Sequence, residues 1–298
     1  GSETSGSIIT PAAYCGITGL RPTYGLVSRH GAMALAWTMD KIGPMCRTVE
    51  DCGCVLDTIA GGDSKDPGSA GKGFYYTPQY ARDLKDLTIG FSPDDLEWVE
   101  AAARPAFEAA MNVLRGCGAK FVEVALPDFP YDSLADIIIG AEAGAIFEPL
   151  IASGEVAELA DPSQIASLRV NLEIPAKDYL RAMRIRTLVQ QKFRELFSKV
   201  DLLAAPSRYT IAPRITEALD GPDPPPGGHP QSPGMRDLIP AGNLAGLPAL
   251  SLPCGFANGM PLGLQLAGPA FSENMTLAVG SYFQRQTDWH KRRPPLLS

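Results

Sequence analysis

The strongest chemical signal in the sequence is the segment Gly1-Ser-Glu-Thr-Ser-Gly-Ser-Ile8. Small residues precede Ser7, and Pro11 follows it after a short interval. Small residues allow the backbone to turn sharply, so that successive N–H groups point at one place, as an oxyanion hole requires. A serine hydroxyl at the end of such a turn could attack a carbonyl carbon whose oxygen those N–H groups hold. The alternative interpretation is a flexible Gly/Ser-rich terminus.

A serine nucleophile also needs a base, and the residue types do not reveal one. His30, His229 and His290 lie far apart along the chain, and each is interpreted as a surface or structural histidine. The Gly-x-Ser-x-Gly motif of a nucleophile elbow is absent. Lys41 and the lysines of residues 65–72 could in principle serve as the base, although surface lysines are the simpler interpretation. From the residues alone, the base is missing.

The cysteines and histidines do not predict a metal site, because no CxxC or HxxxH spacing occurs. We expect no cofactor. The chain has six cysteines, and Cys52 and Cys54 lie two apart on a predicted helix, where their side chains point in different directions. A chain of this length does not need disulfides for stability. We therefore expect reduced thiols and a cytoplasmic location.

The composition limits the classes of partner. The chain has 298 residues, of which 45% are hydrophobic and 20% charged, a composition typical of a folded globular protein. A net charge of −7 with no basic run argues against nucleic acid or an anionic membrane as a partner. The longest apolar segment, residues 134–151, carries three acidic side chains, so we interpret it as a helix of a soluble protein and not as a membrane span.

The hydrophobic pattern predicts an α/β fold. A capping-box-like start at Thr48-Val-Glu-Asp51 predicts a helix over 49–60. A strand at 87–91, a helix at 97–115 and a strand at 120–126 form the kind of unit that builds parallel sheets covered by helices. We expect residues 1–47 to form loops and short strands. Further predicted elements are helices at 134–153, 175–199 and 273–286 and strands at 200–205, 250–256 and 263–267. Pro105 predicts a kink or a late helix start, and residues 206–240 predict a long Pro-rich loop.

The sequence resembles the amidase signature family. The family motif reads approximately Gly-Thr/Ser-Asp/Glu-Thr-Gly-Gly-Ser-Ile-Arg-x-Pro-Ala-x-x-Cys-Gly-x-x-Gly-Leu-Lys/Arg-Pro-Thr-Tyr-Gly, and residues 1–25 follow it closely. Further segments are similar to the family in the same order along the chain: Thr38-Met-Asp-Lys-Ile-Gly-Pro44, residues 200–206, residues 243–249 and residues 259–266. Ser5 and Ile9 depart from the motif, which often has Gly and Arg at these places. The chain resembles the C-terminal two-thirds of a member, starting inside the signature.

This resemblance implies one domain over residues 1–298, with a large mixed β-sheet covered by α-helices on both faces. It also implies a Ser–cis-Ser–Lys amidohydrolase in which Ser7 is the nucleophile. The backbone N–H groups of Thr4, Ser5, Gly6 and Ser7 match the loop that forms the oxyanion hole. The catalytic lysine and the bridging serine lie upstream of the signature in this family. We therefore expect an N-terminal segment of the same enzyme to complete the site.

By position, four residues are predicted to wall a substrate channel: Ile137, Ala141, Tyr209 and Ile211. The alternative interpretation is ordinary core, because buried Ala/Ile-rich helices are common. If these residues do line the channel, an apolar or aryl acyl group is favoured over a charged acid.

Three functions remain open. The first is an amidase that hydrolyses a small-molecule carboxamide or aryl/alkyl amide through a serine acyl-enzyme, releasing ammonia or an amine. The second is the glutaminase (A) subunit of a tRNA-dependent amidotransferase. The third is an inactive fragment of an amidase without its lysine and cis-serine. The sequence leaves open whether the protein forms a homodimer.

Overall fold

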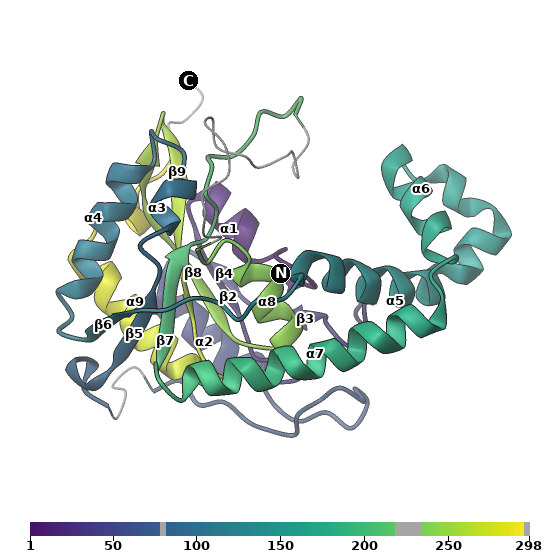
Figure 1. Ribbon diagram of the computed structural model, residues 1–298, viewed down its shortest axis with the longest axis horizontal. Coiled ribbons are helices and arrows are strands. Elements are labelled where there is room, and N and C mark those ends of the chain that lie inside the picture. The colour runs from purple at the N-terminus through teal and green to yellow at the C-terminus, as the bar shows by residue number, and fades with distance from the viewer. Residues whose placement is uncertain (78–81, 218–233, 295–298) are drawn as a thin grey trace.

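The computed structural model describes residues 1–77, 82–217 and 234–294. Strands and helices alternate irregularly along the chain (Figure 1). The strands are β1 (Ser2–Glu3), β2 (Thr18–Arg21), β3 (Lys41–Ile42), β4 (Met45–Cys46), β5 (Thr88–Phe91), β6 (Lys120–Glu123), β7 (Leu202–Pro206), β8 (Ala249–Ala257) and β9 (Met260–Ala267). The α-helices are α1 (Ile9–Cys15), α2 (Val49–Ile59), α3 (Asp95–Trp98), α4 (Arg104–Arg115), α5 (Tyr131–Ser153), α6 (Pro162–Asn171), α7 (Ala176–Phe197), α8 (Leu238–Ala245) and α9 (Glu273–Gln286).

A mixed sheet with the strand order β4-β2-β8-β9-β7-β5-β6 forms the centre of the fold. Strands β6, β5 and β7 are parallel neighbours, while the remaining pairs of this sheet are antiparallel. The hairpin of β8 and β9 is interrupted by a register shift between Pro253 and Gly255. Strands β1 and β3 pair separately as a small antiparallel ribbon. The predicted fold class, a mixed α/β sheet flanked by helices, is confirmed.

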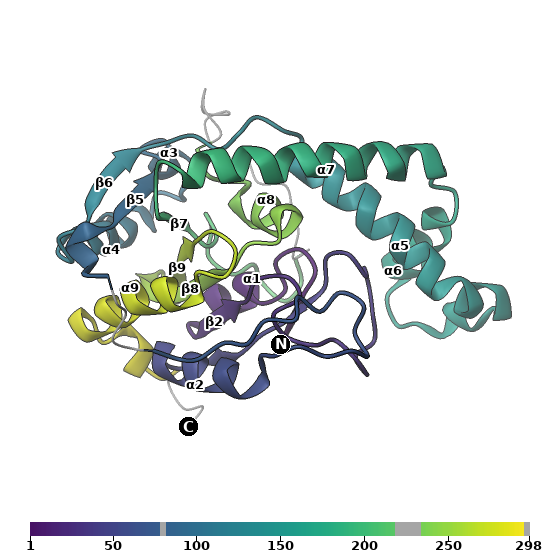
Figure 2. The ribbon, with the colours of Figure 1, turned by 90° about the horizontal axis from the view of Figure 1, so that it is seen from below.

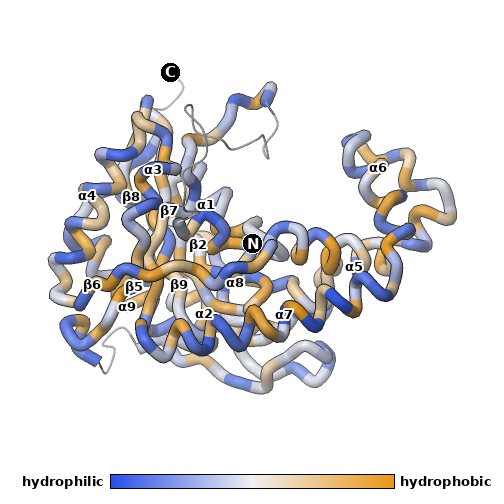
Figure 3. The backbone as a smooth tube through the Cα atoms, viewed as in Figure 1, coloured by the Kyte–Doolittle hydropathy of each residue, from blue (hydrophilic) through white to orange (hydrophobic). Residues whose placement is uncertain are grey.

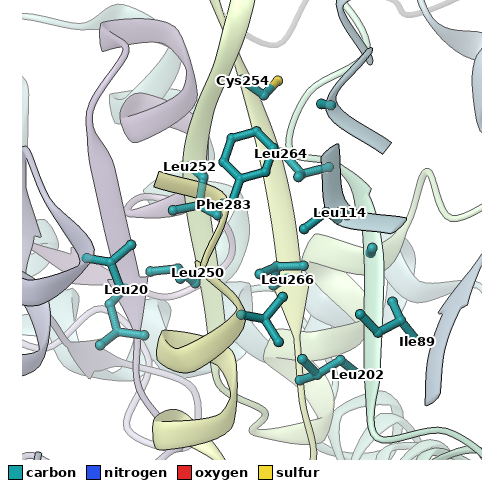
Figure 4. Close-up of a cluster of buried hydrophobic side chains, with 14 of the residues drawn as sticks. Leu20, Ile89, Leu114, Leu202, Leu250, Leu252, Cys254, Leu264, Leu266 and Phe283 are labelled. Atoms are coloured by element: carbon teal, nitrogen blue, oxygen red, sulfur yellow. The ribbon is translucent and has the colours of Figure 1, made fainter. Parts of the chain in front are cut away.

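One face of the sheet carries leucines that alternate with residues of the other face, as the two-residue period of strands requires. Leu250 lies beside Leu266, and Leu252 lies beside Leu264. Figure 4 shows these side chains packing with Phe283 of α9 and Leu114 of α4. Phe283 and the four leucines are fully buried. This layer is one of two large apolar clusters in the described residues whose burial drives folding.

The opposite face carries the small or polar side chains of the same strands, including Ala205, Ser251 and Gln265. Helix α1 packs on β8 and β9 at this face. Small residues allow this close approach. A Cβ at Gly263 would lie 2.5 Å from the Ala13 Cβ, so glycine is required there.

Helices α5 and α7 pack against each other and reach away from the sheet (Figures 1 and 2). The chain turns back at their far end through α6, which packs on α5. Figure 3 shows hydrophilic and hydrophobic residues alternating along α7, the pattern of a helix with one buried face. The buried residues of α7 include Ala182, Val189 and Phe193.

The structure confirms many predicted elements and adds four α-helices among the described residues. Helix α9 has the predicted bounds, and the 87–126 strand–helix–strand unit forms as β5, α4 and β6. Helix α4 begins at Arg104, so Pro105 marks a late helix start. Helices α1, α3, α6 and α8 were not predicted. Of the predicted loop 206–240, residues 238–240 belong to α8, and residues 218–233 lie outside the described residues.

Helix α2 begins as the capping pattern predicted, because the Thr48 hydroxyl accepts a hydrogen bond from the Asp51 N–H at 3.0 Å. We expect Thr48→Ala to lower the free energy of unfolding by about 1 kcal/mol, since one N–H of the first turn loses its acceptor. Thr58→Ala, whose hydroxyl bonds back to the Cys54 carbonyl inside the same helix, is the control and should change stability less. Urea denaturation of both variants measures the difference, and equal effects would contradict the capping role.

Candidate active site

Ser7 lies in the turn that connects β1 to α1, and its side chain is exposed. The preceding Gly6 has φ +113°, a conformation that strongly favours glycine. A side chain at Gly6 would also crowd Ile239 of α8, whose Cγ2 would lie 3.1 Å from the added Cβ. The sequence therefore builds a tight turn at this place and directs the next residue outward.

The carboxylate of Glu3 holds this turn from behind. Its Oε2 accepts hydrogen bonds from the N–H groups of Ile8 at 2.8 Å and Ile9 at 2.9 Å. Its Oε1 accepts from Arg21 at 2.8 Å and from the Asn243 amide at 2.8 Å. Both Glu3 and Arg21 are completely buried. Burial alone would raise the pKa of Glu3, but the charge and hydrogen bond of Arg21 and the bond from Ile9 lower it below its ordinary value.

Helix α1 is stabilised at its start by this carboxylate and not by a neighbouring cap. Ile8 makes no side-chain capping bond, so Glu3 satisfies N–H groups that would otherwise lack partners. A negative charge at a helix N-terminus is also favourable. At the other end, Gly16 adopts the left-handed conformation that ends helices. The helix was missed in the sequence because its N-terminal partner lies in a different element.

Ser7 lines a cavity of about 510 Å³, which we call the Ser7 cavity. Its walls come from the β1–α1 turn, the loop between β2 and β3, the connection after α2, and helices α5 and α6. The described residues that line it are Ser2, Thr4, Ser7, Arg29, His30, Gly31, Ala32, Met33, Ala34, Leu35, Trp37, Asp40, Lys41, Ile42, Lys65, Asp66, Pro67, Phe147, Gln164 and Leu168.

Hydrogen bonds fix the loop that forms one side of the Ser7 cavity. Asp40 accepts from the Thr4 hydroxyl at 2.6 Å and from the N–H groups of Leu35 and Ala36. Arg29 pairs with Asp66 at 2.8 Å, and its hydrogen bonds lower the pKa of Asp66 below its ordinary value. The loop thereby joins the turn before Ser7 to the connection after α2.

Glu142 attaches the same loop to the helices. Its carboxylate accepts from the Thr38 N–H at 2.9 Å, the Thr38 hydroxyl at 2.7 Å and the Tyr179 hydroxyl at 2.8 Å. Arg186 of α7 donates to the Thr38 carbonyl at 2.8 Å. These bonds explain why an apolar helix carries a buried acid, and they position α5 beside the Ser7 cavity.

Lys41 differs most from its expected surface position. The residue is only 2% exposed, and among the described residues its Nζ has no hydrogen-bond partner. Burial and the nearby Arg21 hold the pKa of Lys41 well below its usual range. The sequence gives no local signal of this burial, because the position depends on the pairing of β3 with β1.

The N–H groups predicted to form the oxyanion hole lie in the turn itself. Within residues 1–77, 82–217 and 234–294, no acceptor bonds the N–H of Ser5, Gly6 or Ser7. Unbonded N–H groups in a tight turn are available to a ligand oxygen. Their role as the oxyanion hole, together with that of Thr4, stays a prediction.

The four residues predicted to wall a substrate channel are not among those found lining the Ser7 cavity. Ile137 packs with the cluster between the sheet and helices α5, α7 and α8, and Ala141 is partly buried in α5. Tyr209 is buried, and its hydroxyl donates to Asp95 at 3.0 Å, while Ile211 packs beside it on the other core cluster. On the side of the helices, Phe147, Gln164 and Leu168 line the Ser7 cavity. The substrate-channel assignment of the four residues stays a prediction.

The buried carboxyl group of Asp95, which accepts the hydrogen bond from Tyr209, should make stability depend on pH. Burial raises the pKa of Asp95 to about 7, although the Met235 N–H and the Tyr209 hydroxyl bond to its Oδ1. Between about pH 4 and pH 7 the folded protein therefore binds more protons here than the unfolded chain, so this group makes stability fall as the pH rises. Asp95→Asn should remove that slope in denaturation measured across this range. The exposed Glu97→Gln serves as control, and an unchanged slope in Asp95→Asn would contradict the assignment.

Metal clusters, disulfides and membrane-spanning helices are each absent from the described residues. In the part of the chain that the structure describes, no group of three or more His, Cys, Asp or Glu residues could hold a metal ion. All six cysteines are free thiols. No described helix combines the length and apolar character needed to cross a bilayer.

Comparisons with known proteins agree with this geometry. The amidase family model matches residues 1–277. The glutamyl-tRNA(Gln) amidotransferase (A) subunit of Synechococcus sp. (strain JA-2-3B'a(2-13)) is 39% identical over 99% of this chain and 61% of its own length. The chain thus spans about three-fifths of that relative, which it matches in its C-terminal part.

The chain also matches about three-fifths of the length of two solved structures, at lower sequence identity. One comes from a vestigial protein complex that reveals the evolutionary origins of an s-triazine catabolic enzyme; it has a TM-score of 0.81 and 29% identity, over 96% of this chain and 62% of that chain. Native peptide amidase from Stenotrophomonas maltophilia has a TM-score of 0.78 and 28% identity, over 99% of this chain and 63% of its own. The motif around Ser7, the mixed sheet and these matches together establish that the chain belongs to the amidase signature family.

Proposed function

We propose that the protein is an amidase that uses Ser7 as its nucleophile on a small-molecule carboxamide or aryl/alkyl amide. The observation that carries the proposal is an exposed serine at a tight turn facing a cavity of about 510 Å³. Membership of the amidase signature family supports it. The apolar side chains of Phe147 and Leu168 in the cavity wall favour an apolar or aryl acyl group.

The proposed reaction uses the N–H groups and the serine of the turn. Oγ of Ser7 attacks the amide carbon, and the carbonyl oxygen gains negative charge that the N–H groups of Thr4, Ser5, Gly6 and Ser7 can stabilise. The intermediate collapses to an acyl-enzyme and releases ammonia or an amine. Water then hydrolyses the ester. The family resemblance implies that a lysine and a bridging serine from an N-terminal segment of the same enzyme serve this step.

The test is ammonia release from simple amides by the purified protein without partners. Benzamide and an aliphatic amide are suitable probes, since they differ in the acyl group and share ammonia as product. Release from either amide, lost when Ser7 is replaced by Ala, supports the proposal. Failure to release ammonia or amine from any amide, by a folded and intact protein, would overturn it.

The second candidate function is the glutaminase (A) subunit of a tRNA-dependent amidotransferase, which the name of the curated relative favours. Activity on glutamine that appears only with partner subunits and tRNA would establish this function in place of the first. The third, an inactive fragment, is tested by mass spectrometry of the purified protein. A co-purifying N-terminal piece would argue for a complete enzyme.

We also propose that the protein works in the cytoplasm, because its six cysteines are free thiols.

A further inference from the structure

A second cavity, of about 350 Å³, lies between α4 and the ends of β5 and β7, and we call it the α4 cavity. Its volume is within the range of small-molecule binding sites. None of the described residues that line it also lines the Ser7 cavity. The α4 cavity is therefore a separate site, which the reaction proposed for Ser7 does not use.

The topology of the sheet makes this position a favourable one for a ligand. Strands β5 and β7 are parallel neighbours. The chain leaves β5 toward α4 on one face of the sheet, and it leaves β7 toward α8, which packs with α5 and α7 on the other face (Figure 2). Open α/β sheets bind ligands outside the carboxyl ends of two such strands. Phe91 and Ser92 at the end of β5, and Ala205 and Pro206 at the end of β7, line the α4 cavity.

The walls of the α4 cavity are mainly apolar. Phe107 and Met111 line it from α4, and Leu264 lines it from β9. Phe107 and Leu264 are buried, so their positions are fixed by the core around them. Walls of this kind bind the apolar or aromatic body of a small molecule, while a few polar groups determine its orientation.

Asp95 is the buried polar group of the α4 cavity. The residue is only 4% exposed. Its Oδ1 accepts hydrogen bonds from the Tyr209 hydroxyl at 3.0 Å and the Met235 N–H at 2.6 Å, and both donors are neutral. The structure describes no lysine, arginine or histidine in an ion pair with this carboxylate. A cation placed in the α4 cavity would therefore supply a charge that the described residues do not.

The other charges at the α4 cavity also favour a cation beside Asp95. The neighbouring carboxylate of Asp94 acts with burial to raise the pKa of Asp95 to about 7, so the ionised form lacks a balancing charge. Arg115 carries the one positive charge among the described lining residues. It is exposed, it donates to the Asn112 side chain at 3.1 Å, and its guanidinium lies 5.3 Å from the centre of the Phe91 ring. Solvent screens this exposed cation more than it screens the buried acid.

We propose that the α4 cavity binds a primary amine with an aryl or short alkyl body, whose ammonium group contacts Asp95. The apolar body lies against Phe107, Met111 and Leu264. An ammonium group has three donors, and the hydroxyl of Ser92, a buried residue of the same wall, is available as a second acceptor. The inference does not depend on the proposed function, because the two cavities share no described lining residue.

Three probes of similar shape and different charge test the choice of ligand. They are 2-phenylethylamine, the neutral 2-phenylethanol and the anionic 3-phenylpropanoate, titrated into the purified protein at pH 8 and followed by NMR. The amine should bind at least about 10-fold more tightly than the alcohol, because a charge-assisted hydrogen bond is about twice as strong as a neutral one. The anion should bind no better than the alcohol. An alcohol or an anion that binds as tightly as the amine would overturn the inference.

Asp95→Asn tests the residue itself, since the amide keeps the shape of the side chain and an acceptor for Tyr209 and Met235. This variant should bind 2-phenylethylamine at least about 10-fold more weakly and bind 2-phenylethanol as the wild type does. Glu97→Gln, at an exposed acid of the same helix outside the α4 cavity, is the matched control and should bind the amine normally. Equal affinity of wild type and Asp95→Asn for the amine would contradict the assignment.

Photo-crosslinking of the wild-type protein locates the site without any variant. The probe is 2-(4-azidophenyl)ethylamine, and the attached peptides are identified by mass spectrometry. We expect attachment within residues 91–96, 107–115 or 204–206, reduced by excess 2-phenylethylamine. Attachment confined to residues of the Ser7 cavity would overturn the inference and leave the proposed function standing.

Discussion

Replacing Ser7 by Ala should lower amide hydrolysis at least about 10⁴-fold while leaving the fold intact. The loss follows because no acyl-enzyme can form without the hydroxyl. The fold should persist because the Ser7 side chain is exposed, and surface substitutions of this kind usually change stability by at most about 0.5 kcal/mol. Ammonia release and thermal unfolding, measured on the same preparation, check the two halves of the prediction.

The control for this variant is Ser64→Ala, at an exposed serine outside the residues that line the Ser7 cavity. It should keep full activity and full labelling by a fluorophosphonate. Retention of hydrolysis in Ser7→Ala, or labelling of a different residue in the wild type, would remove Ser7 from the reaction.

Replacing Glu3 by Ala should have the largest effect on stability. Arg21 would be left buried and without its anionic partner, and removing one member of a buried ion pair costs about 3–5 kcal/mol. The N–H groups of Ile8 and Ile9 and the amide of Asn243 would also lose an acceptor. Guanidinium denaturation measures the loss. Glu195→Ala, which breaks an exposed ion pair with Lys192, should cost no more than about 0.5 kcal/mol.

The carboxylate of Glu3 should also make the stability of the protein depend on pH. Because the folded-state pKa of Glu3 is lower than its unfolded value, its contribution to stability is present above the unfolded pKa of about 4.3 and is lost as the pH falls toward the folded pKa. Wild type should therefore lose more stability than Glu3→Gln on acidification below about pH 4. Parallel acid transitions for the two proteins would show that Glu3 is not the titrating group.

The sequence predicted the turns and helix starts that depend on residues close together along the chain. The turn before Ser7 follows from its small residues, α2 follows from the Thr48 cap, and the late start of α4 follows from Pro105. Helix α6 carried a comparable signal that was overlooked: Asp161 caps it by accepting from the Ser163 N–H, with Pro162 in its first turn.

Features that depend on distant residues were not predictable. Helix α1 depends on Glu3, whose carboxylate reaches forward five and six residues. The burial of Lys41 depends on its pairing with β1, and Phe147 and Leu168 reach the Ser7 cavity only because α5 and α6 fold back toward the loop. Hydrophobic periodicity predicts which face of a helix is apolar. It does not predict which cavity that face will line.

Glu142 of α5 and Arg186 of α7 bind the loop between β2 and β3 through Thr38, so the helices and the Ser7 turn form different walls of the Ser7 cavity. Under the proposed function, selectivity for the acyl group would reside in the side chains of α5 and α6 that line the Ser7 cavity, and reactivity would reside in the Ser7 turn, which the buried pair of Glu3 and Arg21 supports. If the proposed function is correct, substitutions at Phe147 or Leu168 should therefore change which amides are accepted and leave the hydrogen bonds of the Ser7 turn in place.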